Sequence, residues 1–160
     1  MSDFHANSPD FNDVEWEKDK QRIIDMDADL LVGGDIDDWI LPIDPRFSHP
    51  RYLGRNSNII RSLAKKIIEE RFDGILDRIK IVGVGNHETS LMKHCGIDPI
   101  DLLLLEIERR TGNLPPIHAG YTGMFKIEFR EGNHVVSDDW YYHHGTGGAA
   151  PVTKGMIDFN

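Results

Sequence analysis

The stretch IKIVGVGNHE, residues 79–88, decides the fold, because a buried strand ends within it and polar side chains follow at once. Its apolar residues run as far as Val84, and glycine stands on either side of Val84. A short apolar run that ends in glycine is typical of a strand buried on both faces of a sheet. We therefore predict a buried strand whose carboxyl end is followed by an amide, an imidazole and a carboxylate, from Asn86, His87 and Glu88.

A second strand of the same kind precedes this one, and helices are predicted between and after the two. Residues 30–32 form a short apolar run that Gly33 and Gly34 end, so the run delivers Asp35 at the carboxyl end of a strand. Capping residues and the helical spacing of apolar side chains predict three helices. They run from about Asp13 to Met26, from Ser57 to Phe72 and from Pro99 to about Gly112.

A β-hairpin is predicted in the last third of the chain. Phe125, Ile127 and Phe129 alternate with charged residues, which is typical of a half-buried strand, and a Gly-Asn turn leads into a partner strand that ends at His144. Strand and helix alternate first, and the hairpin follows. This order predicts an α/β fold with mixed β-sheets covered by helices, and with a site at the carboxyl ends of the strands.

The composition is that of an ordinary globular protein. Of the 160 residues, 39% are hydrophobic and 28% are charged, so we expect a single domain over residues 1–160. No apolar run is long enough to cross a bilayer and no leader precedes a cleavage site. Together with the lone Cys95, this predicts a cytoplasmic protein with no membrane partner. The formal charge of −9 disfavours sequence-independent binding of nucleic acid, which needs Lys and Arg to neutralise phosphates.

Polar groups gather in four short segments of the chain. They are DFH at 3–5, GDIDD at 34–38, GNHE at 85–88 and YHHG at 142–145. Asp3 and His5 stand two apart, so in an extended segment both can bind one cation. Asp35 can bridge two cations that lie about 3.5–4 Å apart, and Asn86 offers a neutral oxygen. Such mixed oxygen and nitrogen ligands suit manganese, iron or zinc.

In this order the four segments resemble the calcineurin-like metallophosphoesterase family. The family pattern is Asp-x-His, then Gly-Asp-x-x-Asp, then Gly-Asn-His-Asp/Glu, then His before a small residue, and finally Gly-His-x-His. The resemblance covers the chain from Asp3 to Gly145, and the ordered set is more specific than any one segment. It implies a four-layer α/β/β/α sandwich, incomplete in this chain, and a hydrolase that uses two divalent metal ions.

The resemblance also implies which side chains bind the two metal ions. The implied ligands are Asp3, His5, Asp35, Asn86 and His144. The first metal takes Asp3, His5 and Asp35, and the second takes Asp35, Asn86 and one histidine of the pair at 143–144. We choose His144, because it precedes the glycine and because strand alternation puts His143 on the opposite face.

Two further residues are implied to be catalytic. His87 protonates the leaving oxygen, and Asp38 holds and polarises its imidazole. If the backbone is extended at Asn86 and His87, the two side chains point in different directions. Glu88 is expected to make a contact behind the metal ligands, and Asp37 to be a solvated loop charge.

The chain departs from the family pattern in three ways. No Gly-His-x-His occurs, and the two residues before Asp3 are too few for a leading strand, so we expect a domain that is truncated at both termini. Trp39 stands where the protein phosphatases of the family carry arginine, which disfavours a phosphoprotein substrate. Candidates to hold the substrate phosphate are Arg46, Arg51 and Arg55.

These observations predict a metal-dependent phosphoesterase, a phosphatase or a phosphodiesterase, with a phosphate ester as its substrate. Nucleotides, nucleic-acid ends, phospholipid head groups and phosphoproteins all fit the chemistry, so nucleic acid is expected only as a substrate. The alternative is a non-catalytic scaffold on the same fold: His87 favours the enzyme, and the missing last motif favours the scaffold. A glycosidase with two carboxylates would leave Asn86 and His87 unexplained. The sequence leaves the oligomeric state open.

Overall fold

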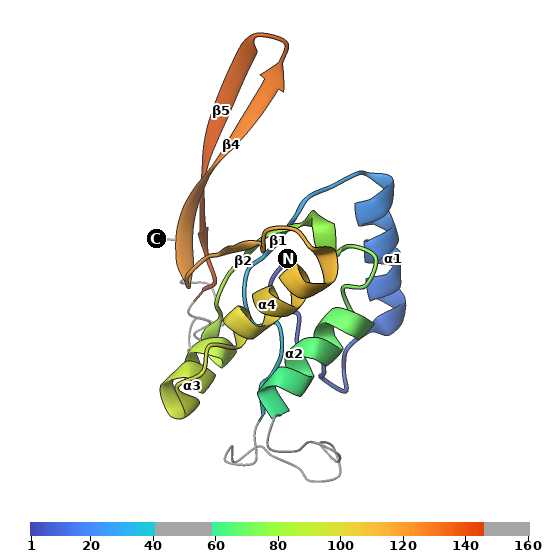
Figure 1. Cartoon of the computed structure of the whole chain (residues 1–160), viewed down its shortest axis with the longest axis vertical. Helices are drawn as coiled ribbons and strands as arrows, with labels where there is room; N and C mark the ends of the chain where they lie inside the picture. The colour runs from blue at the N-terminus through green and yellow to red at the C-terminus, as the bar shows by residue number, and fades with distance from the viewer. Residues whose placement is uncertain (41–58, 146–160) are drawn as a thin grey trace, which may run out of the picture.

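The computed structural model describes residues 1–40 and 59–145, which form helices, a small parallel sheet and a separate two-stranded hairpin (Figure 1). An α/β fold is therefore confirmed. In chain order the elements are α1 (Asp13–Asp25), β1 (Leu30–Val32), α2 (Ile59–Glu70), η2 (Leu76–Arg78), β2 (Ile79–Val82), α3 (Asn86–Cys95), α4 (Pro99–Thr111), β3 (Ile117–His118), β4 (Thr122–Glu131) and β5 (His134–His143).

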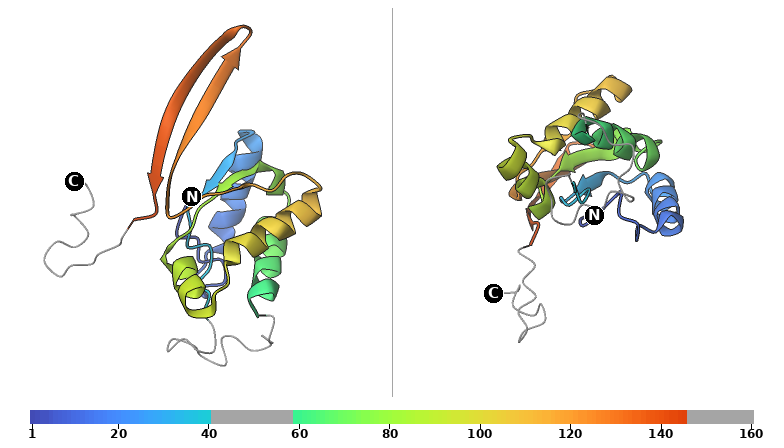
Figure 2. Two further views of the ribbon diagram at one scale, coloured as in Figure 1. Left: turned by 60° about the vertical axis from the view of Figure 1, so that its left-hand side comes forward. Right: turned by 90° about the horizontal axis from the view of Figure 1, so that it is seen from below.

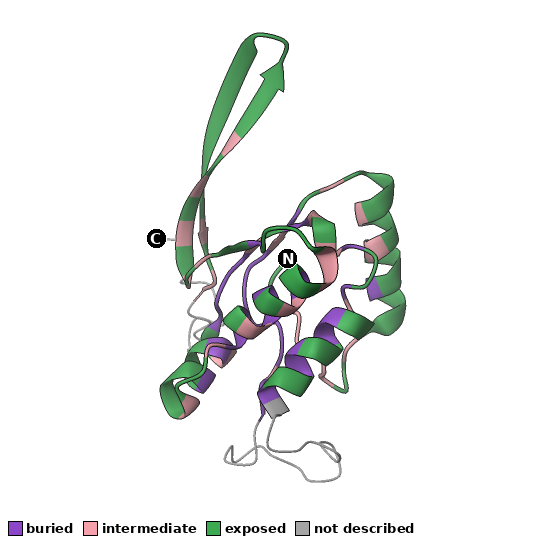
Figure 3. Ribbon diagram, viewed as in Figure 1, coloured by how far each residue is buried: buried purple, intermediate pink, exposed green. Residues whose placement is uncertain are grey.

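The parallel sheet has the strand order β1-β2-β3, and its core lies on one face. Val32 and Val82 are paired neighbours on that face and are 1% and 2% exposed, and α2 and α4 pack against each other over it (Figure 2). The other face carries the aligned row Leu31, Ile81 and Ile117, of which Ile117 is 64% exposed. Buried residues lie on the strands β1 and β2 and along the helices α2 and α4 (Figure 3).

Local capping signals place two of the predicted helices correctly. The Asn12 side chain accepts a hydrogen bond from the Glu15 N–H and begins α1, and Asp98 accepts from the Ile100 N–H and begins α4. The helix α4 ends at Thr111, and its C-cap Gly112 has the left-handed conformation that glycine favours. The third predicted helix is observed as α2, and its predicted start at Ser57 lies outside the described residues.

The backbone at Asn86 and His87 is helical and not extended, because α3 begins there. Strand β2 ends at Val82, and α3 starts at Asn86 with Gly85 as its N-cap. The Glu88 side chain accepts a hydrogen bond from the Gly85 N–H at 2.9 Å, which satisfies a donor that the first turn of a helix leaves free. Asn86 and His87 therefore project from the first turn of a helix.

The hairpin forms a sheet of its own instead of joining the parallel strands. Its Gly-Asn turn and its two strands are confirmed, although β5 ends at His143, one residue earlier than predicted. Figures 1 and 2 show β4 and β5 extending away from the helices. Phe125 and Ile127 are half-buried as expected, whereas Phe129 is 59% exposed. Trp140 is 49% exposed and stacks on Phe125, its neighbour on the opposite strand.

The segment that follows the turn after β1 is described as far as Ile40. Trp39 and Ile40 are buried, at 3% and 5% exposure, and the phosphate candidates Arg46, Arg51 and Arg55 lie outside the described residues. None of the helices in the described part of the chain is long and apolar enough to span a membrane.

An ion-pair cluster on α4 predicts a pH-dependent stability. Arg109 and Arg110 both hydrogen-bond to Glu106, and Arg110 also reaches Glu69 of α2. The Arg109 hydrogen bond is the largest cause that lowers the pKa of Glu106 to about 2. Because this pKa is lower in the folded state, the stabilisation is present above the unfolded-state pKa and is lost as the pH falls toward 2.

We expect Glu106→Gln to lower the melting temperature near neutral pH by roughly 2–4 °C, with the difference disappearing toward acid pH. Thermal denaturation at a series of pH values measures this effect. Glu108→Gln, an exposed change on the same helix, is the control. A deficit of equal size at every pH would contradict the assignment.

Candidate metal centre

The N-terminal segment lies alongside the turn that follows β1. The backbone N–H groups of Asp3, Phe4 and Ala6 donate to the carbonyl oxygens of Gly34, Asp35 and Ile36, at 3.1, 2.8 and 2.7 Å. These contacts bring the first polar segment, at 3–5, next to the second, at 34–38. Residues far apart in the chain thereby come together at the carboxyl end of the sheet.

Two glycines allow the turns after β1 and β2 to touch. A Cβ on Gly85 would overlap the backbone nitrogen and the carboxylate of Asp35. A Cβ on Gly34, whose φ is +101°, would overlap Gly85 in turn. Only glycine fits at both positions, and the contact places Asp35 against the first turn of α3.

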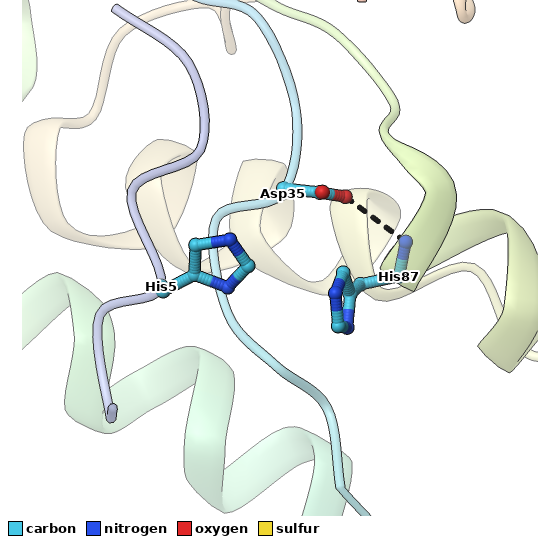
Figure 4. Close-up of side chains that lie close together, drawn as sticks. All are labelled: His5, Asp35 and His87. Carbon is cyan, nitrogen blue, oxygen red and sulfur yellow. Dashed lines mark hydrogen bonds between the residues drawn. The ribbon is translucent and has the colours of Figure 1, made fainter. Parts of the chain in front are cut away.

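Asp35 is the centre of the cluster and is 2% exposed. Its Oδ1 accepts a hydrogen bond from the His87 N–H at 2.9 Å, and its Oδ2 lies 3.2 Å from His144 Nε2. Ligand atoms of Asp3, Asp35 and His144 lie within 4.8 Å of one another, as do those of His5, Asp35 and His87. Figure 4 shows His5, Asp35 and His87, which come from the N-terminal segment, the turn after β1 and the start of α3.

The hydrogen bonds of His144 identify which of its nitrogens faces the cluster. Its Nδ1 lies 2.9 Å from the Gly33 carbonyl oxygen, which can only accept, so Nδ1 carries a proton. In the neutral imidazole, Nε2 then turns a lone pair toward Asp35 Oδ2 and toward Asn86 Oδ1, which is 3.3 Å away. Three acceptors that converge in this way fit a cation. His143 belongs to neither group: its ring accepts from the Gly145 N–H.

His5 is oriented by Asp38, which differs from the role expected for that carboxylate. His5 Nδ1 lies 2.8 Å from Asp38 Oδ1, so His5 Nε2 is left to bind a cation. A histidine that donates to a carboxylate through one nitrogen and offers the other is a common arrangement at metal sites. The carboxylate of Asp38 therefore contacts His5, where the sequence had suggested His87.

His87 is held by the backbone of Asp38 and by the side chain of Asp35. Its Nδ1 lies 3.0 Å from the Asp38 carbonyl oxygen, and its N–H donates to Asp35. Because a carbonyl only accepts, Nδ1 carries the proton and Nε2 is left for a substrate. The ring is half-buried and lies edge-on to the ring of His5, at 5.1 Å between centroids.

Two neighbouring carboxylates have structural contacts. Asp37 was expected to be a solvated loop charge, and this is wrong: it is 1% exposed, and its Oδ1 accepts from the Asn7 N–H at 3.0 Å. Glu88 is fully buried and contacts the backbone of Asp35 behind the cluster. The hydrogen bonds of these two buried carboxylates hold the turn after β1 in place.

Tyr121 is a neighbour of the cluster that the sequence did not indicate. Its carbonyl oxygen accepts from the His144 N–H at 3.0 Å, and its hydroxyl donates to the Gly145 carbonyl oxygen at 2.5 Å. Burial, and then the charges of Asp35 and Asp3, raise the pKa of Tyr121 above its usual value. Tyr121 therefore stays protonated at neutral pH and holds the turn that carries His144.

The cluster combines negative charge with unusual backbone geometry. Within residues 1–40 and 59–145, no lysine or arginine forms an ion pair with Asp3, Asp35, Asp38 or Glu88. Four of the five non-glycine residues with positive φ in these ranges belong to the cluster or its border, namely Asp3, His5, Asp35 and Trp39. Such conformations cost of order 1 kcal/mol each and collect at functional sites.

A third group of possible ligands, Asp98, Asp101 and His118, lies outside this cluster. His118 Nε2 is 2.9 Å from Asp98 Oδ2 and 3.8 Å from Asp101 Oδ1, at the start of α4. Asp101 is 73% exposed, and a surface ion pair accounts for these contacts.

Comparisons with protein-family models, with curated proteins and with solved structures found no match. The chemistry of this cluster is therefore inferred from its residues and their geometry.

Proposed function

We propose that this chain is a metal-dependent phosphoesterase that hydrolyses a phosphomonoester or phosphodiester at a site for two divalent cations. The observation that carries the proposal is the position of Asp35, whose carboxylate lies within 4.8 Å of ligand atoms of Asp3 and His144 in one group and of His5 in the other. A carboxylate shared in this way suits a bridging ligand between two cations.

The proposed ligands are Asp3, His5, Asp35, Asn86 and His144. His144 Nε2 and Asn86 Oδ1 face Asp35 from one side, and His5 approaches with Nδ1 engaged by Asp38. This mixture of oxygen and nitrogen suits Mn²⁺, Fe²⁺ or Zn²⁺. When bound, such cations supply Lewis acidity toward the phosphate oxygens and toward the attacking water.

His87 is the proposed proton donor to the leaving oxygen. Its Nδ1–H is directed to the Asp38 carbonyl oxygen, which leaves Nε2 to carry the proton that is transferred. The backbone hydrogen bond to Asp35 fixes the start of α3, and with it the position of the ring. A positioned acid of this kind contributes a factor of about 10²–10⁴ in rate.

The finer architecture that we propose is the four-layer sandwich of the calcineurin-like family. Two apolar surfaces support it. The row Leu31, Ile81 and Ile117 lies on the face of the parallel sheet opposite to α2 and α4. Phe125 and Trp140 share one apolar face of the hairpin. A second sheet layer would bury both surfaces, and apolar area removed from water is the main driving force for such packing.

The test combines metal titration with kinetics on bis(p-nitrophenyl) phosphate and p-nitrophenyl phosphate in Mn²⁺. His87→Gln should leave Mn²⁺ binding unchanged and lower the rate by about 10²–10⁴, because only the proton donor is lost. His134→Gln, at the exposed tip of the hairpin, is the matched control and should change neither.

Two results would contradict the proposal. Wild-type chain that takes up no Mn²⁺ would favour the scaffold alternative, since a scaffold needs no formed site. Wild-type hydrolysis that His87→Gln does not slow would remove His87 from the mechanism.

A further inference from the structure

One buried carboxylate, that of Glu88, joins the two turns that carry the proposed cation ligands. Its side chain is fully buried and accepts four N–H groups. Oε2 accepts from the backbone of Asp35 and Gly85, both at 2.9 Å. Oε1 accepts from the Ile36 backbone at 2.8 Å and from the Trp39 indole Nε1 at 2.9 Å.

These four donors come from both sides of the cluster. Three belong to the turn after β1, which carries Asp35 and Asp38, and the fourth caps the helix that carries Asn86 and His87. Ion-pair contacts with lysine or arginine are absent for Glu88 within the described ranges. The four N–H groups therefore stabilise the negative charge of the carboxylate through charge-assisted hydrogen bonds.

The same turn contains strained backbone at both of its ends. Asp35 has φ +48° and Trp39 has φ +47°, and for a bulky residue such as tryptophan a positive φ is rare. Each of these two residues donates one hydrogen bond to Glu88, from the backbone of Asp35 and from the indole of Trp39. Removing the acceptor removes the contacts that hold the turn in this shape.

We propose that Glu88 is a positioning residue, which holds the turn from Asp35 to Trp39 against α3 so that the cation ligands meet. This inference deepens the proposed function, because the ligands that Glu88 positions are those of the proposed metal site. The carboxylate acts without touching a cation itself, since both of its oxygens are taken by N–H groups.

The chemistry requires glutamate at this position. Glutamine has the same shape, but its amide NH₂ would face two N–H donors in place of an oxygen, and no flip of the amide avoids this. Glu88→Gln therefore changes the hydrogen bonding without opening a cavity. Trp39→Phe is the complementary change, because it removes one donor and keeps an aromatic ring.

The test is Mn²⁺ titration of the folded variants, together with amide and indole NMR spectra of the metal-free proteins. Glu88→Gln should weaken Mn²⁺ binding by about 10–100-fold, as mutation of residues behind metal ligands does, and Trp39→Phe should weaken it less. The Trp39 indole resonance and the Asp35 and Ile36 amide resonances should move in Glu88→Gln. The control is Leu91→Ala, which destabilises the same helix from its core side and should leave Mn²⁺ affinity unchanged at a temperature where it is folded.

The outcomes separate this inference from the proposed function. Glu88→Gln that binds Mn²⁺ within about twofold of wild type, or that leaves the Trp39, Asp35 and Ile36 resonances in place, would overturn the positioning role. A wild type that binds no Mn²⁺ would overturn the proposed function, while the resonances of the metal-free protein would still decide whether Glu88 holds the turn.

Discussion

Replacing Asp35 with asparagine is expected to abolish tight Mn²⁺ binding and to lower phosphoesterase activity about a thousandfold, which is ~4 kcal/mol of transition-state stabilisation. Asparagine keeps the shape of the side chain and can still accept from the His87 N–H through its remaining oxygen. It loses the charge and the second oxygen that faces His144. Both proposed cations therefore lose a ligand in one step.

The control for this change is Asp27→Asn. Asp27 also has a positive φ, +49°, and pairs with Arg78 far from the cluster, with its side chain 92% exposed. An exposed pair of this kind contributes little, so the control should keep both Mn²⁺ affinity and activity. Titration calorimetry and initial rates measure the two effects. If Asp35→Asn behaves like Asp27→Asn, Asp35 does not bridge metals.

Replacing Gly85 with alanine is expected to have the largest effect on folding. The φ of Gly85 is −105°, which alanine adopts freely, so the cost is steric alone. The new methyl group would overlap the backbone and the carboxylate of Asp35, which cannot move without breaking the contacts with Glu88 and His87. Overpacking against backbone predicts a loss of ~3 kcal/mol or more, or a melting temperature lower by roughly 10 °C.

Gly120→Ala is the matched control for Gly85→Ala. A Cβ at Gly120 meets nothing nearer than the Thr122 carbonyl oxygen, at 3.4 Å. Thermal denaturation should therefore show almost no change. A melting temperature for Gly85→Ala within about 2 °C of wild type would mean that the two turns do not touch as described.

Elements with local signals could be predicted from the sequence. Asn12 and Asp98 cap their helices with their own side chains, and the Gly-Asn pair after β4 makes the hairpin turn. Helix α3 lacks such a residue before it, because its N-cap is Gly85 and the capping acceptor comes from Glu88 inside the helix. From the sequence alone, the polar residues of its first turn are therefore assigned to the end of the preceding strand.

The members of the site could be predicted better than their contacts. Polar residues at strand ends indicated Asp35 and His144, which the fold brings together. The partner of Asp38 could not be read from spacing, because it depends on how the N-terminal segment lies along the turn. The burial of Asp37 has the same cause, since its carboxylate bonds to the backbone of Asn7.

The exposure of the hairpin could not be predicted either. Alternating side chains indicate that one face of a strand is apolar, and Phe125 and Trp140 do share such a face. Whether that face is covered depends on a second layer, which strand periodicity does not report. Phe129 consequently follows the expected alternation and is nonetheless exposed.

The measurement that tests the central claim most directly is anomalous diffraction from crystals of this chain soaked in Mn²⁺. We predict two peaks about 3.5–4 Å apart that flank the Asp35 carboxylate, with His144 and Asn86 beside one of them and His5 beside the other. Crystals with no manganese within bonding distance of Asp35, or with manganese only at Asp98 and His118, would contradict the account.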